Sequence, residues 1–122
     1  MTILPGELRF IVLMFENRSF DHLLGYIPNI GGLTGNESNF VNGENGEKIC
    51  VSNQAEYTID PGPDHSHKGV RTQLFGDYKN YDGMMPSMSG FVKNYGEIDF
   101  DKKHNIMKCF DPEKIPVIAE LV

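Results

Sequence analysis

The 122-residue sequence has no tryptophan, only two cysteines, and no stretch that concentrates lysine or arginine. Its formal net charge of -6 would repel a nucleic-acid backbone, so nucleic acid is not an expected partner. No apolar run approaches the roughly 20 residues that a membrane-spanning helix needs. No basic segment precedes a hydrophobic one near Met1, so neither a membrane span nor a signal peptide is predicted.

The two cysteines, Cys50 and Cys109, stand far apart with no CxxC spacing and no histidine cluster beside them. A zinc site built on them is therefore not expected, and free thiols are the simpler interpretation. Whether they pair with each other stays open at this point.

What the sequence does contain is 13 glycines, 7 prolines and a few clear element signals. Residues 8–15 (LRFIVLMF) form a near-continuous apolar run, which is typical of a parallel strand buried on both faces. Ser19 then predicts the N-cap of a short helix that reaches about Tyr26. The opening order is thus strand, polar turn, helix.

Weaker signals follow along the chain. Apolar residues flanking Asn45-Gly46 suggest a hairpin or a long loop, and the prolines of residues 60–63 exclude regular structure there. The remaining pattern predicts helices over residues 65–75 and 90–95, a strand over 106–110, and a final helix capped by Asp111.

These elements predict an α/β fold that is incomplete. A strand buried on both faces needs parallel neighbours and covering helices, but residues 1–122 offer only one such strand. We therefore expect the chain to be the N-terminal part of one domain, with the remaining part of that domain missing.

Ligands of parallel α/β sheets bind beyond the carboxyl ends of the strands, where Glu16 and Asn17 follow the first predicted strand. Their oxygens suit Ca²⁺, Mg²⁺ or Mn²⁺. The alternative, favoured by spacing alone, is that Glu16 lies near a helix N-terminus and Asn17 shapes a turn. Ser19, Asp21 and His22 are too close together in the chain for a catalytic triad, so local helix roles are expected.

A second candidate site is the proline-broken loop that carries Asp60, Asp64, His65 and His67. A rigid loop that presents imidazoles suits phosphate binding or general acid catalysis. A solvated polar loop is an equally good interpretation of these residues alone.

Residues 11–25 (IVLMFENRSFDHLLG) closely resemble the opening motif of the phosphoesterase family of bacterial phospholipases C and related acid phosphatases. The resemblance continues in order through further segments: residues 32–39 (GLTGNESN), 60–76 (DPGPDHSHKGVRTQLFG), 89–95 (SGFVKNY) and 106–122 (IMKCFDPEKIPVIAELV). It spans nearly the whole chain.

The resemblance implies part of a three-layer sandwich with a mostly parallel sheet, like alkaline phosphatase. It also implies a hydrolase in which a divalent metal (Ca, Mg, Mn or Zn) and a hydroxyl nucleophile act on a phosphate ester or phospholipid. Glu16 and Asn17 match the family's first two metal ligands.

In the same resemblance, His65 matches the histidine that contacts the phosphate or protonates the leaving group. His67 is an additional candidate for the phosphate site, because the interval from Asp60 to His65 is longer here than in the family's Asp-Pro-x-His segment. The family's nucleophile lies in a later segment, so none is expected in this chain. The alternative is a non-catalytic, truncated remnant of such an enzyme.

Overall fold

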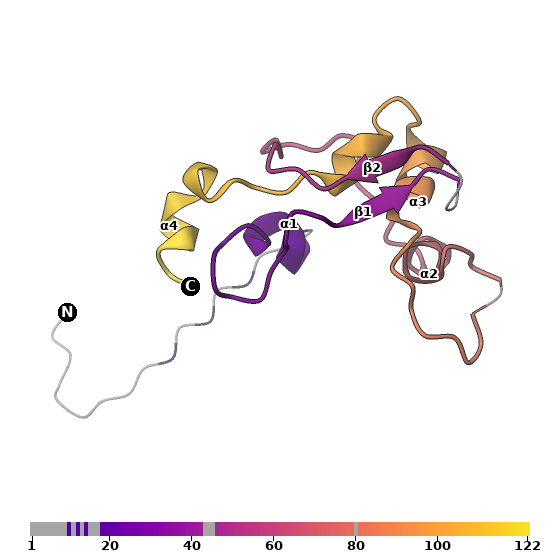
Figure 1. Cartoon of the computed structure of the whole chain (residues 1–122), viewed down its shortest axis with the longest axis horizontal. Helices are drawn as coiled ribbons and strands as arrows, with labels where there is room; N and C mark the ends of the chain where they lie inside the picture. The colour runs from indigo at the N-terminus through magenta and orange to yellow at the C-terminus, as the bar shows by residue number, and fades with distance from the viewer. Residues whose placement is uncertain (1–9, 11, 13, 15–17, 43–45, 80) are drawn as a thin grey trace, which may run out of the picture.

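The computed structural model describes residue 10, residue 12, residue 14 and residues 18–42, 46–79 and 81–122. Within these residues the chain forms short helices and one hairpin (Figure 1). In order they are α1 (Phe20–Leu24), β1 (Ser38–Phe40), β2 (Lys48–Cys50), α2 (His67–Phe75), α3 (Phe91–Ile98), the 3-10 helices η1 (Lys103–Met107) and η2 (Pro112–Lys114), and α4 (Pro116–Ala119). None of the helices described is long and apolar enough to cross a membrane.

The hairpin suggested around Asn45-Gly46 is confirmed by the pairing of its two strands. β1 and β2 run antiparallel with Asn39 opposite Ile49. The buried Asn39 side chain accepts a hydrogen bond from the Phe91 amide (2.9 Å) and donates one to the Met88 carbonyl (3.1 Å). One asparagine thus joins the hairpin to the start of α3.

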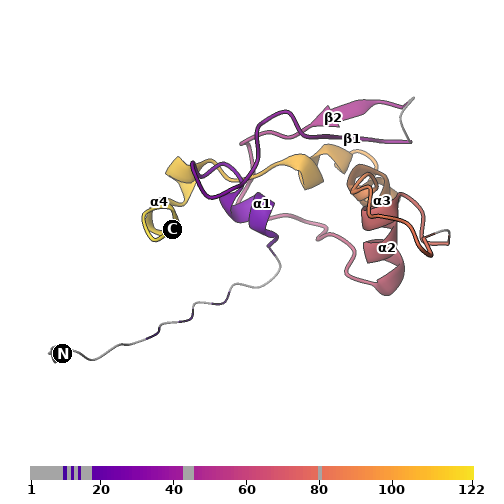
Figure 2. The same ribbon diagram turned by 60° about the horizontal axis from the view of Figure 1, so that its bottom comes forward.

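The helices α2 and α3 pack together at one end of the molecule (Figure 2). Both were expected, although α2 begins at His67 and α3 extends to Ile98. Val92 and Tyr95 of α3 are almost wholly buried, at 0% and 1% exposure. Burial of this face, rather than helix propensity, stabilises helices this short.

A second hydrophobic cluster lies around α1 and α4, at the other end of the molecule (Figure 1). Its buried members are Ile27, Ala55, Phe110 and Ile115. The segments that supply Ala55 and Phe110 run side by side, joined by the backbone hydrogen bond from the Ala55 amide to the Cys109 carbonyl (3.1 Å). Cys109 is buried and Cys50 exposed, and both are free thiols.

The strand predicted over residues 106–110 is wrong. Ile106 and Met107 belong to η1, and the next residues make only single bridges, from Lys108 to Ser52 and from Phe110 to Gln54. One bridge is parallel and the other antiparallel, so no continuous ladder forms. Of these residues, Phe110 is buried in the hydrophobic cluster around α1 and α4.

The final helix is also interrupted, although its predicted cap is confirmed. The Asp111 side chain accepts a hydrogen bond from the Glu113 amide (3.0 Å). Ile115 then leaves the helical region, with φ -129° and ψ 49°, before α4 begins at Pro116. The cause is steric, because a residue that precedes proline is disfavoured in the α conformation.

The sheet of the described residues is this two-stranded antiparallel hairpin, in a small α/β arrangement. Phe10, Val12 and Met14 from the predicted strand 8–15 are 85%, 86% and 82% exposed and lie in no strand. The predicted burial is therefore wrong for these three residues, since no strand among the described residues covers them. The other residues of that run lie outside the described residues.

Gly90, the residue before α3, gives a testable measure of how closely α2 and α3 approach. A Cβ atom at Gly90 would overlap the Thr72 carbonyl oxygen of α2, and the Gly90 amide donates to the Gln73 carbonyl (3.0 Å). We expect Gly90→Ala to lower the free energy of unfolding by about 3 kcal/mol, because a backbone atom cannot move aside.

The measurement is urea unfolding followed by circular dichroism. Gly62→Ala is the matched control, because a Cβ atom at Gly62 would meet no atom within 4 Å. Equal stability of the two variants would contradict the tight α2–α3 contact.

Candidate functional site

The two candidate metal ligands, Glu16 and Asn17, lie outside the described residues. Their role stays a prediction. No group of three or more histidine, cysteine, aspartate or glutamate side chains in the described part of the chain is arranged to hold a metal ion.

Immediately after these residues, Arg18 is fixed by three contacts. Its guanidinium donates to the Tyr57 carbonyl (2.8 Å), lies 2.6 Å from Nε2 of His22, and stands 5.6 Å from the centre of the Phe110 ring. An arginine only donates hydrogen bonds, so Nε2 of His22 is the acceptor and the ring is assigned as neutral. Burial lowers the pKa of His22, and the nearby Arg18 charge lowers it further.

The structure bears out the local roles expected for α1. Ser19 is the N-cap, and its Oγ accepts a hydrogen bond from the His22 amide (3.1 Å). The His22 ring is buried edge-on against Phe110, with ring centres 5.2 Å apart. The Ser19 hydroxyl therefore caps a helix, and His22 packs in the cluster.

The candidate histidines His65 and His67 are both described and both exposed. His65 lies in the loop ahead of α2, and His67 is the first residue of that helix. In the described part of the chain, neither ring makes a hydrogen bond to protein. Both imidazoles are thus accessible to a ligand.

The turn around His65 has a defined hydrogen-bond pattern. The Asp64 carboxylate accepts from the Ser66 amide (2.7 Å), and Ser66 Oγ accepts from the Gly69 amide (3.0 Å) as the N-cap of α2. The Ser66 amide holds the pKa of the Asp64 carboxyl below its usual range, and the neighbouring His65 contributes in the same direction. The Asp64 carboxylate therefore stays ionised, and it lies next in the chain to the exposed His65 imidazole.

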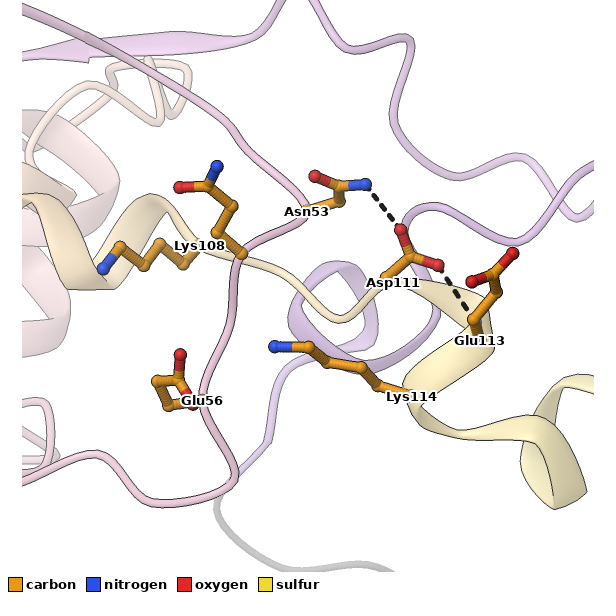
Figure 3. Close-up of a pocket in the computed structure, with 7 residues that line it drawn as sticks. Asn53, Glu56, Lys108, Asp111, Glu113 and Lys114 are labelled. Carbon is orange, nitrogen blue, oxygen red and sulfur yellow. Dashed lines mark hydrogen bonds between the residues drawn. The ribbon is translucent and has the colours of Figure 1, made fainter.

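A separate open depression of about 450 Å³ lies beside η2 (Figure 3). Lysine, carboxylate and amide side chains line it: Asn53, Gln54, Glu56, Lys108, Asp111, Glu113 and Lys114. Several of these groups hold the fold. Asn53 donates to Asp111 (2.6 Å), and Lys114 donates to the Ala55 carbonyl (2.8 Å). Of the candidate residues that the structure describes, none lines this depression.

Comparison with known proteins identifies the kind of enzyme to which this sequence is related. Residues 8–122 match the model of the phosphoesterase family. Non-specific phospholipase C6 of Arabidopsis thaliana is 44% identical over 117 residues, which cover 92% of this chain and 22% of that protein. Non-specific phospholipases C1 and C3 of the same plant are 41% and 36% identical, over 21% and 23% of their lengths.

The chain belongs to the phosphoesterase family. It spans about a fifth of the length of these curated relatives.

Proposed function

We propose that this chain is the N-terminal part of a metal-dependent phosphoesterase of the phospholipase C type, which hydrolyses phosphate ester bonds. The observation that carries the proposal is the family match over residues 8–122. The exposed His65, on a turn fixed by Asp64 and Ser66, supports it. The relatives are named for phospholipase C activity, which favours a phospholipid or other phosphate ester as substrate.

The complete domain in this proposal is a three-layer sandwich of the alkaline phosphatase type. The apolar run of residues 8–15 would be one of its parallel strands, covered by segments from the remaining part of the domain. Phe10, Val12 and Met14 are exposed in the 122-residue chain, so burial of this run would require those further segments.

A divalent metal would be held in part by Glu16 and Asn17. A carboxylate and an amide carbonyl are hard oxygen donors, so their chemistry fits calcium, magnesium or manganese, and zinc less closely. When bound, the metal would supply charge that screens the phosphate and activates a hydroxyl nucleophile. In this proposal the hydroxyl nucleophile would come from a part of the domain outside these 122 residues.

His65 would act on the leaving-group side of the reaction. Its imidazolium would protonate the departing alkoxide oxygen, or donate a hydrogen bond to an equatorial phosphate oxygen as negative charge develops there. Asp64 would remain anionic beside it, because the Ser66 amide holds the pKa of its carboxyl below the usual range. His67, two residues further on, would be an additional phosphate ligand.

The second candidate is a non-catalytic, truncated remnant of such an enzyme. The observation that favours it is the exposed apolar surface of the chain. Val117, Leu121 and Val122 are 72%, 71% and 60% exposed. Surface of this kind is expected where a covering segment has been lost.

The test begins with the polypeptide that the source cells make. Mass spectrometry would search for peptides on both sides of Val122, and the purified protein would be assayed on a phospholipid and a soluble phosphate diester. We expect a longer product whose hydrolysis is abolished by metal chelation and restored by adding back a divalent metal.

Glu16→Ala should lower both metal content and hydrolysis in that protein. Glu97→Ala, which removes an exposed carboxylate from α3, is the control. A product that ends at Val122 would count against the proposal that this protein is an enzyme. A Glu16→Ala variant with normal metal content and normal activity would count against Glu16 as a metal ligand.

A further inference from the structure

The loop that carries His65 is held by side chains of α3 and of the turn that precedes η1. The Tyr95 hydroxyl of α3 donates a hydrogen bond to the Pro61 carbonyl (2.6 Å). The Lys102 ammonium donates to the Asp60 carbonyl (2.8 Å). Tyr95 is 1% exposed, so the first of these bonds forms in a site that water cannot easily enter.

Gln73 of α2 makes the contact nearest to the histidine. Its Nε2 donates to the carbonyl of Asp64, the residue before His65 (2.8 Å), and also to Oδ1 of Asn94 on α3 (2.8 Å). An amide nitrogen has two hydrogens, so both are used and the orientation of the Gln73 side chain is fixed. Asn94 is 4% exposed and Gln73 is half-buried, so this is a partly buried bridge from α3 through α2 to the loop.

Two further features keep the loop close to α2. A Cβ atom at Gly69 would overlap the Asp64 carboxyl group, so only glycine allows this approach. Ser66, on the other side of His65, is tied to the same helix as its N-cap. The main chain is therefore fixed on both sides of His65, whereas its ring is exposed.

We infer that Gln73, Asn94 and Tyr95 are positioning residues for His65, which hold its main chain at a set distance from the bound phosphate ester. The inference rests on the function proposed above. A partly buried amide bridge adds modest net stability, because each bond replaces one with water. It does restrict geometry, and a displacement of about 1 Å of a catalytic group can cost about 100-fold in rate.

The decisive variant is Gln73→Glu, which keeps the shape of the side chain but replaces the donor nitrogen. Its carboxylate would face two acceptors, the Asp64 carbonyl and Asn94 Oδ1, so the bridge would open. In the natural polypeptide we expect kcat for an alkyl phosphate ester to fall by about 10- to 100-fold. The KM should change much less, because the ester is held by other groups.

Tyr95→Phe is a milder variant, because it removes only the hydroxyl that binds Pro61. It should lower the same kcat in the same direction while the aromatic ring continues to fill the core. This variant keeps the inference testable if Gln73→Glu folds poorly.

Thr72→Ala is the matched control for loss of stability. Thr72 precedes Gln73 in the chain and is 3% exposed. Its hydroxyl donates a hydrogen bond to the Lys68 carbonyl within α2 (3.0 Å). It should lower the melting temperature without a selective fall in kcat. If Thr72→Ala and Gln73→Glu lose activity in proportion to melting temperature, the role is structural and the inference is wrong.

A readout without activity separates this inference from the proposed function. In the 122-residue chain, the ring signals of His65 in nuclear magnetic resonance spectra should shift or broaden in Gln73→Glu and remain in place in Thr72→Ala. Unchanged His65 signals would overturn the positioning role. An inactive natural polypeptide with shifted signals would instead overturn only the proposed function.

Discussion

His65→Ala is expected to lower kcat of the natural polypeptide for an alkyl phosphate ester by about 10²- to 10⁴-fold, the range of a general acid. An alkoxide is a poor leaving group and needs a proton as its bond to phosphorus breaks. A nitrophenyl ester releases a stable phenolate, so its hydrolysis should fall far less. This difference in leaving-group sensitivity, measured on the purified enzyme, is the result that identifies an acid.

His104→Ala is the matched control, since His104 is another exposed histidine and lies on η1. It should leave both rates unchanged. If His67→Ala produces the selective loss and His65→Ala does not, the acid is His67. Equal losses on both esters after His65→Ala would point to phosphate binding instead of proton donation.

Phe110→Ala is expected to lower the free energy of unfolding of the 122-residue chain by about 3–5 kcal/mol. The ring is 4% exposed and belongs to the cluster of Ile27, Ala55 and Ile115. It also contacts His22 and Tyr57, with ring centres 5.2 and 5.6 Å away. Its removal leaves a cavity between α1 and the C-terminal segment, and Arg18 loses the face over which it lies.

Urea unfolding followed by circular dichroism measures this loss. Phe100→Ala is the control of the same residue type, because Phe100 is 58% exposed. Its cost should stay below about 1 kcal/mol, as for a surface substitution. If both phenylalanine variants cost the same, the cluster around Phe110 contributes no specific stability, and the remnant hypothesis gains support.

Local signals predicted several elements of this fold correctly. Ser19 and Asp111 are caps because a short polar side chain can reach the free amides of the next turn, whatever surrounds it. The hairpin and the helices α2 and α3 were also expected from the sequence. The sequence signal for each of these elements lies within a single short segment of the chain.

The errors share one cause, which is dependence on distant neighbours. Residues 106–110 have the composition of a strand, but the segment from Ser52 to Gln54 meets them at only two positions. Phe10, Val12 and Met14 have the pattern of a buried strand, yet nothing in the described part of the chain covers them. A hydrophobic pattern shows that a segment could form a buried strand. Whether the strand forms depends on a partner segment that pairs with it.

The candidate site divides in the same way. The sequence by itself determined the family, and it gave His65, Glu16 and Asn17 as candidate site residues, because motifs and residue types carry that information directly. Only the tertiary structure decided that Gln73 and Asn94, which are 21 residues apart in the chain, form a hydrogen bond next to the loop that carries His65. The physical reason is that amide hydrogen bonds depend on distance and direction, which the packing of α2 on α3 sets.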